Sequence, residues 1–587
     1  MKNDYIVKKT YLSFVIVSIL TSLTAIVGML IDNVIVGQTL GSDSLGAMGI
    51  VGPVSLVFSA IGNICASGGG AKAARALGRG ERDKFCIVFT TNMIFVIVAG
   101  TILTVAGMLL TPQIARLLGA KGNLAAPSKS YLYGYFPGAI PTIMLSAMMS
   151  FVRIDGSPKL PLICIGVMSA ANIILDLLMV HVFHQGMYGM ALATTISYGL
   201  ALMVSFTHFL KKDSTLRLVK PKKILAEIGS TVVTGFATAI SRICETIKVM
   251  LLNNMMVVYV SVIAVTALNV RTQAFNFLGA VVIGIGQAIT PTVGMFYGEE
   301  DRTAIKDTLK TTLKFGMMVI AILMVGVIGI SGVFPKLLGV TDGTTLDMAK
   351  VALRFFAIGM PIYLFNTILL NYYQCTKKVG MATMICTLQS LVYTIVFAFI
   401  FIRVWGANGV WLAFLLGELF TTITTFIVIF IRNGKISFKI TDLMLLKDDF
   451  GGDPKDKLEI SIGNNMDEVI TISSGIHKFF NNREIDEKNL NTIALVVEEM
   501  AGNVVKHAFK QGEKRWLDFT IIDKMDMVIL RIRDNGAAFD PLAHLSSCSN
   551  EDEYGIKLIH ALADDFEYRR SMGLNNLIIR LKKHVIA

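Results

Sequence analysis

The stretch Ala171-Asn-Ile-Ile-Leu-Asp-Leu-Leu-Met-Val180 is almost wholly apolar, yet it carries a carboxylate at Asp176. Asn172 lies four residues before Asp176, so on a helix the two side chains share one face. A carboxylate at the centre of a membrane helix costs about 2.5–3.5 kcal/mol and normally faces a polar cavity, where it binds an ion, a proton or a substrate. The alternative is a structural carboxylate paired with a neighbouring helix. Asp32, in the apolar run 20–36, favours the functional interpretation.

The composition is that of a membrane protein. Of the 587 residues, 53% are hydrophobic and 16% are charged, and the mean hydropathy is +0.63. The net charge of +12 fits cytoplasmic loops rich in Lys and Arg. The basic residues are scattered between apolar runs, which argues against nucleic acid as a partner. The seven cysteines form no CxxC pair and are expected to be free thiols.

Runs of apolar residues predict an all-α polytopic membrane domain of about twelve transmembrane helices, because each span needs ~20 such residues. Loops rich in Lys and Arg alternate with loops that carry few positive charges. The positive-inside rule then places both termini in the cytoplasm of a multi-pass protein of the cell membrane. The runs begin near Tyr11, Met48, Phe85, Tyr131, Leu160, Met187, Gly229, Val262, Leu313, Val351, Met381 and Val410.

An internal repeat divides this region into two six-helix bundles, at about 10–215 and 230–435. Residues 220 positions apart are often identical: Gly78 and Gly298, Leu117-Leu118-Gly119 and Leu337-Leu338-Gly339, Pro141 and Pro361, Gly186 and Gly406, and Gly189 and Gly409. Repeats of this kind build transporters whose central site opens alternately to either side of the membrane.

The polar cluster is not repeated. Asp32, Asn172, Asp176 and Thr194 correspond to Leu252, Val392, Val396 and Phe414. A cluster that only stabilised the fold would be expected in both halves. The sequence therefore predicts a dedicated cation or proton site in the first half, with carboxylates and neutral oxygens as ligands for a hard cation.

These four polar positions and the twelve-span repeat resemble the multidrug and toxic compound extrusion (MATE) transporters of the DinF-like branch. The resemblance covers residues 10–435. It implies two bundles around a central cavity, and export of amphipathic, often cationic, drug-like compounds in exchange for Na⁺ or H⁺. Asp32, Asn172, Asp176 and Thr194 would bind the coupling ion.

The resemblance also marks Glu245 as an acidic position of the Na⁺-coupled members, although no carboxylate partner is found in the tenth span. Arg242 and Lys248 lie three residues to either side of Glu245, so local charge pairing is an alternative role. Glu418 is expected either to pair with Arg271 or to line the cavity.

The composition changes near residue 435, and we expect a transmembrane domain at 1–435, a linker at 436–455 and a soluble domain at 456–587. Alternating and helical patterns predict an α+β two-layer domain with antiparallel strands. The expected strands are 458–462, 516–522, 527–533 and 577–581, and the expected helices are 467–480, 488–509 and 555–565.

Three motifs mark this domain. Glu499, Asn503 and His507 fall on one helix face, where a carboxylate suits a general base and an amide oxygen suits Mg²⁺. Asp534-Asn535-Gly536 follows a strand, and its carboxylate suits adenine. Tyr554-Gly555-Ile556 opens a helix whose N-terminus suits phosphate.

The order of these motifs resembles the GHKL ATP-binding fold of the anti-sigma-factor serine kinases. That resemblance implies ATP and Mg²⁺ as ligands, Glu499 as catalytic base, Asn503 on Mg²⁺, and His507, Asp534, Gly536 and Gly555 at the nucleotide. Glu553 stands where the family usually has glycine. A degenerate fold that is kept only for protein contacts is the alternative.

The sequence thus predicts a secondary active multidrug antiporter with a cytoplasmic ATP-binding module that is regulatory or has serine-kinase-like activity. An anti-anti-sigma-like or other cytoplasmic regulatory protein would be its partner. The alternative is a membrane-anchored anti-sigma-like kinase switch that uses the transporter half as a sensor. An ATP-driven pump is disfavoured because the chain has no GxxxxGK[ST] motif.

Overall fold

The computed structural model describes residues 5–211, 214–338, 340, 343–463, 465–481, 483, 485–505, 516–524, 526–537, 539–541 and 554–583. Contacts divide the chain into two compact units. The membrane unit comprises Ser13–Glu299 and Thr308–Leu445, and the second unit is built on Leu446–Ala587 with Met1–Leu12 and Glu300–Asp307.

The described part of the membrane unit contains 12 helices long and apolar enough to span a bilayer, as predicted. Its first half comprises α1 (Tyr5–Thr39), α2 (Gly41–Asn63), η1 (Ile64–Gly69), α3 (Gly70–Gly78), α4 (Arg82–Leu117), η2 (Gly122–Leu124), α5 (Ala125–Tyr135), η3 (Phe136–Gly138), α6 (Ala139–Ile154), α7 (Leu160–Leu177), η4 (Leu178–Val182), α8 (Gly186–Phe206) and η5 (Thr207–Leu210). Its second half comprises α9 (Ile224–Tyr259), α10 (Val262–Gly298), α11 (Arg302–Ile330), α12 (Phe334–Leu337), α13 (Gly343–Cys375), α14 (Val379–Thr387), η6 (Leu388–Val392), α15 (Tyr393–Trp405), α16 (Ala407–Asn433) and α17 (Ile440–Leu443).

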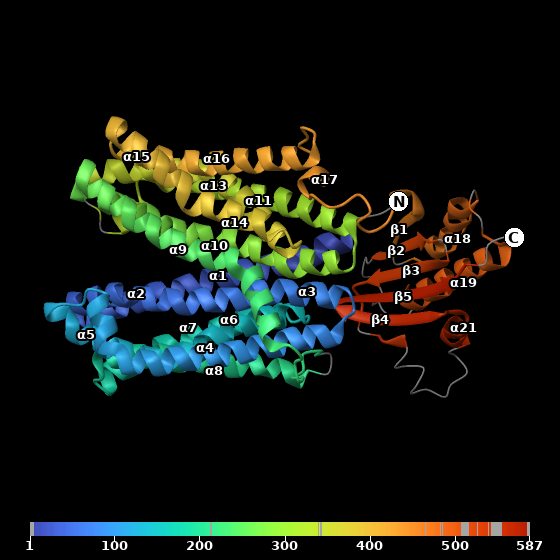
Figure 1. Ribbon diagram of the computed structural model, residues 1–587, viewed down its shortest axis with the longest axis horizontal. Coiled ribbons are helices and arrows are strands. Elements are labelled where there is room, and N and C mark those ends of the chain that lie inside the picture. Colours follow the sequence, from blue (N-terminus) through green and yellow to red (C-terminus); the bar gives the residue numbers. More distant parts are fainter. Residues whose placement is uncertain are drawn as a thin grey trace. The chain divides into compact units, whose positions relative to one another are not determined.

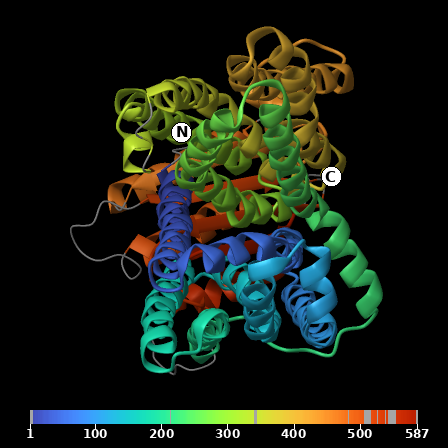
Figure 2. The same cartoon turned by 90° about the vertical axis from the view of Figure 1, so that its left-hand side faces the viewer.

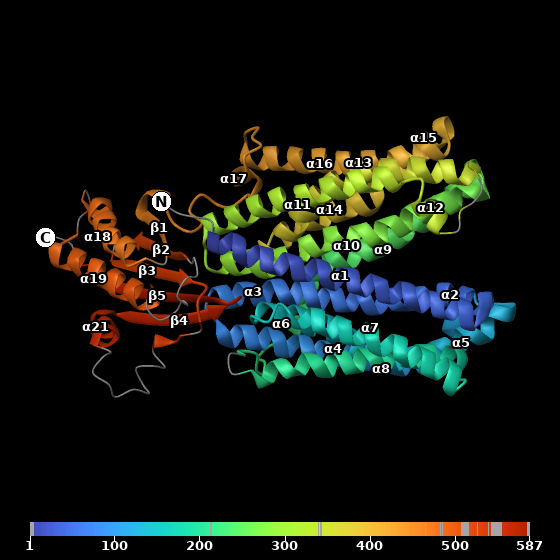
Figure 3. The ribbon, with the colours of Figure 1, turned by 180° about the vertical axis from the view of Figure 1, so that it is seen from behind.

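The two halves repeat in structure as well as in sequence. Adding 220 to the bounds of α1 gives 225–259, and α9 spans Ile224–Tyr259. The same shift carries 41–78 onto 261–298, and α10 spans Val262–Gly298. Figures 1 and 3 show α4, α7 and α8 on one side of this unit and α11, α13 and α16 on the other. Seen end-on in Figure 2, most of the blue-to-teal helices lie below most of the green-to-orange ones, although a green helix extends down beside the blue helices.

Large apolar side chains point outward from these helices. Leu109 is 73% exposed, Ile322 is 67% exposed and Val325 is 68% exposed. Lipid is the solvent for such a surface, so the apolar side chains need no burial. Helices in a membrane instead pack through small residues that allow their backbones to approach closely.

The repeated glycines Gly78 and Gly298 supply one such contact between the halves. A Cβ atom at Gly78 would lie 2.1 Å from the carbonyl oxygen of Met295 on α10. A Cβ atom at Gly298 would lie 2.3 Å from the carbonyl oxygen of Arg75 on α3. The pair is glycine in both copies because the backbones of α3 and α10 touch at this point.

We expect Gly78→Ala to destabilise the protein by roughly 1–3 kcal/mol, because the added methyl group must push α3 away from α10. The measurement is the thermal unfolding midpoint of the full-length protein in detergent. Gly166→Ala is the matched control, since a Cβ atom there meets nothing within 4 Å. Equal midpoints for the two variants would contradict the close contact.

The second unit contains a five-stranded antiparallel sheet in the order β1-β2-β3-β5-β4. Helices α18 and α19 pack on each other, as do α19 and α21, and Figure 1 shows the three on one face of the sheet. A core that includes Phe480, Val497, Phe519 and Ile579 joins the two layers. The elements are η7 (Pro454–Asp456), β1 (Lys457–Gly463), α18 (Met466–Phe480), α19 (Glu487–Asn503), β2 (Trp516–Asp523), β3 (Met527–Asp534), α21 (Tyr554–Leu562), β4 (Asp565–Ser571) and β5 (Leu574–Lys582).

The predicted two-layer fold is confirmed, but one element was missed. The helix expected at 555–565 ends at Leu562, and the strand β4 begins at Asp565. Strand β4 lies at the edge of the sheet and pairs only with β5 among the described strands. Its sequence Asp-Phe-Glu-Tyr-Arg-Arg-Ser contains four charged residues, and edge strands often carry charges, so hydrophobicity alone did not reveal it.

Candidate functional site

Two carboxylates of the first half face each other. Asp32 on α1 and Asp176 near the end of α7 lie within side-chain interaction distance. Asn172, one turn before Asp176, donates its Nδ2 hydrogen to Asp176 Oδ2 at 3.3 Å. Asp176 is 0% exposed. Each carboxylate keeps one buried oxygen, Oδ1, that accepts no hydrogen bond from the described residues.

Two adjacent carboxylates repel each other when both are ionised, and a shared proton or a bound cation relieves that repulsion. The Oδ1 atoms without a hydrogen-bond partner and the amide oxygen of Asn172 are oxygen ligands that suit a hard cation. These residues therefore fit either Na⁺ or H⁺ as a transported ion. Thr194 on α8 donates its hydroxyl hydrogen to the Met190 carbonyl of its own helix at 3.1 Å.

Two tyrosines complete the surroundings of this pair and were not predicted from the sequence. Tyr131 on α5 lies in electrostatic range of both carboxylates, and Tyr198 on α8 in range of Asp32. Because tyrosines are common in membrane helices, only the position of Tyr131 and Tyr198 relative to the two carboxylates distinguishes them from the other tyrosines.

The equivalent positions of the second half carry no ionisable side chain. Leu252 is 1% exposed where the first half has Asp32. Phe414, the counterpart of Thr194, lies with its ring centroid 3.3 Å from the guanidinium carbon of Arg271. At these equivalent positions the first half thus holds carboxylates and other polar groups, and the second half holds apolar or aromatic side chains.

Glu245 on α9 is paired locally. Its Oε1 accepts a hydrogen bond from Lys248 Nζ at 2.8 Å, so the geometry matches the charge-pairing alternative. Glu418 on α16 accepts from Asn366 Nδ2 at 3.0 Å. Among the described ion pairs none joins Glu418 to Arg271.

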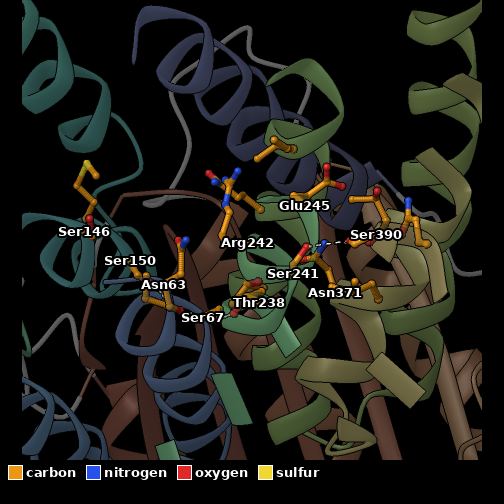
Figure 4. A pocket seen from close by; sticks show the side chains of 18 of the residues that line it. Asn63, Ser67, Ser146, Ser150, Thr238, Ser241, Arg242, Glu245, Asn371 and Ser390 are labelled. Carbon is orange, nitrogen blue, oxygen red and sulfur yellow. Dashed lines mark hydrogen bonds between the residues drawn. The ribbon is translucent and has the colours of Figure 1, made fainter. Parts of the chain in front are cut away.

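A cavity of about 300 Å³ lies between the two halves of the membrane unit. Its walls come from α2, η1 and α6 of the first half, and from α9, α10, α13 and η6 of the second. Figure 4 shows polar side chains of both halves around it. They include Asn63, Ser67, Ser146, Ser150, Arg153, Thr238, Ser241, Arg242, Glu245, Gln287, Asn371, Gln389 and Ser390.

Two π-helical segments shape this cavity. Segment η1 contributes Ser67, whose hydroxyl lies 2.6 Å from that of Thr238. Segment η6 contributes Ser390, whose hydroxyl lies 3.2 Å from that of Ser241. Widened turns of this kind occur frequently at functional sites. The sequence predicted a central cavity, and it marked Glu245 as a candidate site residue. It gave no signal for these serines and threonines, because such residues are common in membrane helices.

In the second unit, Asp534 ends β3 and is held by its neighbours. Its Oδ1 accepts hydrogen bonds from Gly536 N at 2.7 Å and from Asn575 Nδ2 at 2.9 Å. Asp534 is 4% exposed. Asn575 on β5, which no sequence motif indicated, therefore orients the carboxylate expected at adenine.

The other residues expected at the nucleotide lie on two helices. Glu499 and Asn503 are one turn apart at the end of α19, and Gly555 is the second residue of α21. Helix α21 has nine residues, and α19 packs against it. His507 and Glu553 lie outside the described residues.

Two family models match the chain. MatE matches residues 18–178 and 237–400, and the histidine kinase-like ATPase domain matches residues 463–581. The multidrug export protein MepA of Staphylococcus saprophyticus is 23% identical over 443 residues, which are 74% of this chain and 96% of that protein. MepA of Staphylococcus aureus strain MRSA252 is 22% identical over 445 residues, again 74% and 96%.

Solved structures share the fold of the membrane unit. An outward-facing multidrug resistance MATE family transporter of the MOP superfamily matches with a TM-score of 0.67 and 19% identity, over 71% of this chain and 94% of its own. A MOP superfamily transporter from Pyrococcus furiosus matches with a TM-score of 0.68 and 19% identity, over 75% and 97%. The chain belongs to the MatE family of transporters and carries a histidine-kinase-like ATPase domain after its membrane unit.

Proposed function

We propose that the protein is a secondary active multidrug exporter that exchanges Na⁺ or H⁺ for amphipathic compounds. The observation that carries the proposal is the pair of the half-buried Asp32 and the buried Asp176, which occurs in one half of a duplicated scaffold and does not line the central cavity. The likeness to multidrug export proteins over 96% of their length supports it. The acidic site in the first half also supports the DinF-like branch.

The pair couples the ion to the cargo through helix packing. Without a cation or proton, repulsion between Asp32 and Asp176 favours separation of α1 from α7. Binding of the ion removes that repulsion and favours a closer approach. Because α7 and α8 pack on each other, a shift of α7 is passed to its own bundle, and alternating access follows when one bundle moves against the other.

The test uses full-length protein in proteoliposomes loaded with a panel of anionic, zwitterionic and cationic fluorescent compounds. An inward Na⁺ gradient and an inward pH gradient are applied separately. We expect one of them to accelerate export of part of the panel at least tenfold over the no-gradient control. Export that ignores both gradients, or that requires ATP hydrolysis, would exclude the antiport mechanism.

The second unit is proposed to bind ATP and Mg²⁺ and to act as a regulatory or serine-kinase-like module. Glu499 would be the catalytic base, Asn503 would bind Mg²⁺, and His507, Asp534, Gly536 and Gly555 would contact the nucleotide. The hydrogen-bonded carboxylate of Asp534 supports this assignment. With both termini in the cytoplasm of a cell-membrane protein, the module would meet ATP and a regulatory protein partner such as an anti-anti-sigma-like protein.

A further inference from the structure

The charges that line the central cavity are mainly positive. The guanidinium groups of Arg153 and Arg242 and the carboxylate of Glu245 are the ionisable lining groups other than tyrosine among the described residues. The family resemblance implies a cationic cargo, but two arginines against one carboxylate disfavour a cation in this space.

Arg153, near the end of α6, is the most informative of these groups. It is 8% exposed, and its guanidinium makes no hydrogen bond or ion pair with a described residue, so that its Nε is an orphaned donor. A guanidinium group has five N–H donors and stays protonated. Burial of such a cation is costly unless an anion accompanies it. The Arg153 guanidinium therefore favours binding of an anionic group in the cavity.

The single carboxylate of the lining does not provide that anion. Glu245 is bound to Lys248 at 2.8 Å, and the Lys248 side chain is only 10% exposed. Arg242, one turn before Glu245 on the same helix, is exposed to the cavity and makes no described side-chain hydrogen bond. Lys248 therefore already neutralises the charge of Glu245, and the guanidinium groups of Arg153 and Arg242 are both available to bind a ligand. Figure 4 shows Arg242 beside Glu245 at the cavity.

The rest of the lining suits an amphipathic molecule. Phe275 and Tyr363 meet edge-to-face, with ring centroids 5.3 Å apart, and Met149 and Leu370 add apolar surface. Pockets for drug-sized ligands combine such apolar walls with a few polar groups that fix orientation.

Resting on the proposed export function, we propose that the cargo is an amphipathic organic anion, whose carboxylate, sulfonate or phosphate group pairs with Arg153 and Arg242 while its apolar part lies against Phe275 and Tyr363. Guanidinium groups bind such oxyanions through paired, charge-assisted hydrogen bonds. The coupling cation and the cargo then occupy separate sites of opposite charge, so they cannot compete for the same carboxylate.

The test compares two probes that share one fluorophore, dansylglycine as the anion and dansylcholine as the cation. Equilibrium binding to the purified full-length protein is measured first, because it does not depend on ion coupling. We expect dansylglycine to bind at least tenfold more tightly than dansylcholine. Arg153→Gln should weaken dansylglycine binding roughly ten- to hundredfold, as loss of a charge-assisted hydrogen bond predicts, and Arg153→Lys should restore part of it.

Two further variants distinguish loss of ligand binding from misfolding of the protein. Arg242→Gln changes an exposed side chain of the cavity and should also weaken dansylglycine binding. Arg354→Gln changes an exposed arginine of α13 that does not line the cavity, and it should leave binding unchanged. Each variant is checked for its thermal unfolding midpoint.

Preference for dansylcholine, binding of neither probe, or unchanged dansylglycine binding in both Arg153→Gln and Arg242→Gln would overturn the inference. Failure of the export function has a different signature. In that case dansylglycine binds with the expected arginine dependence, but neither ion gradient moves it across the proteoliposome membrane.

Discussion

Asp32→Asn is expected to reduce ion-driven export by one to two orders of magnitude while leaving the fold intact. The substitution keeps the size of the side chain but removes one of the two charges that would hold a cation or a proton. Interactions with charged groups contribute about 1.5–3 kcal/mol each, which corresponds to roughly ten- to hundredfold weaker ion binding. The initial rate of gradient-driven export from proteoliposomes measures the effect.

The same substitution should raise the thermal unfolding midpoint or leave it unchanged. Asp32 and Asp176 face each other within a low-dielectric region, and neutralising one of them removes the repulsion between like charges. A structural role predicts the opposite sign, because a carboxylate that stabilised the fold would lower the midpoint when lost. The two roles are thus separated by the direction of a stability change as well as by activity.

Asp347→Asn is the matched control for Asp32→Asn. The Asp347 side chain is 75% exposed at the start of α13 and pairs only with Lys350, at 3.0 Å, among the described residues. We expect wild-type export from this variant. If Asp32→Asn exported as fast as Asp347→Asn at equal protein levels, the carboxylate pair would not be the coupling site.

The membrane fold could be predicted because lipid imposes a strict rule on the sequence. Every span needs a long apolar run, and the 220-residue repeat survives at positions such as Gly78 and Gly298, where backbones touch and only glycine fits. Asp32 and Asp176 stood out for the same reason, since charged groups in apolar runs are rare. That Tyr131 and Tyr198 lie in electrostatic range of these carboxylates could be found only from the three-dimensional arrangement.

Arg153 was missed because its place in the sequence conceals its environment. It lies two residues before Asp155 and close to Lys159, so it reads as the charged end of a span. Its burial beside the cavity depends on the helices that pack around α6, among them α2, α4 and α8. Strand β4 was missed for a related reason, since its pairing with β5, and not its own composition, identifies it as a strand.

The nucleotide site of the second unit gives the other large expected effect. Asp534→Asn should weaken ATP binding by about one to two orders of magnitude, because an anionic acceptor for the adenine amino group is replaced by a neutral amide. The fold should be retained, since an amide oxygen can still accept from Gly536 N and Asn575 Nδ2, which now lie 2.7 and 2.9 Å from Oδ1. Titration of the full-length protein with a fluorescent ATP analogue and Mg²⁺ measures the change.

Asp526→Asn, in the exposed turn between β2 and β3, is the control and should bind ATP as the wild type does. If wild-type protein binds no ATP, the degenerate-fold alternative is correct and the module acts through protein contacts alone. If ATP binds and the export rate differs between wild type and Asp534→Asn in the presence of ATP, the module regulates transport. ATP binding with unchanged export favours the kinase switch instead, because the nucleotide would then serve phosphorylation of a partner and not the movement of cargo.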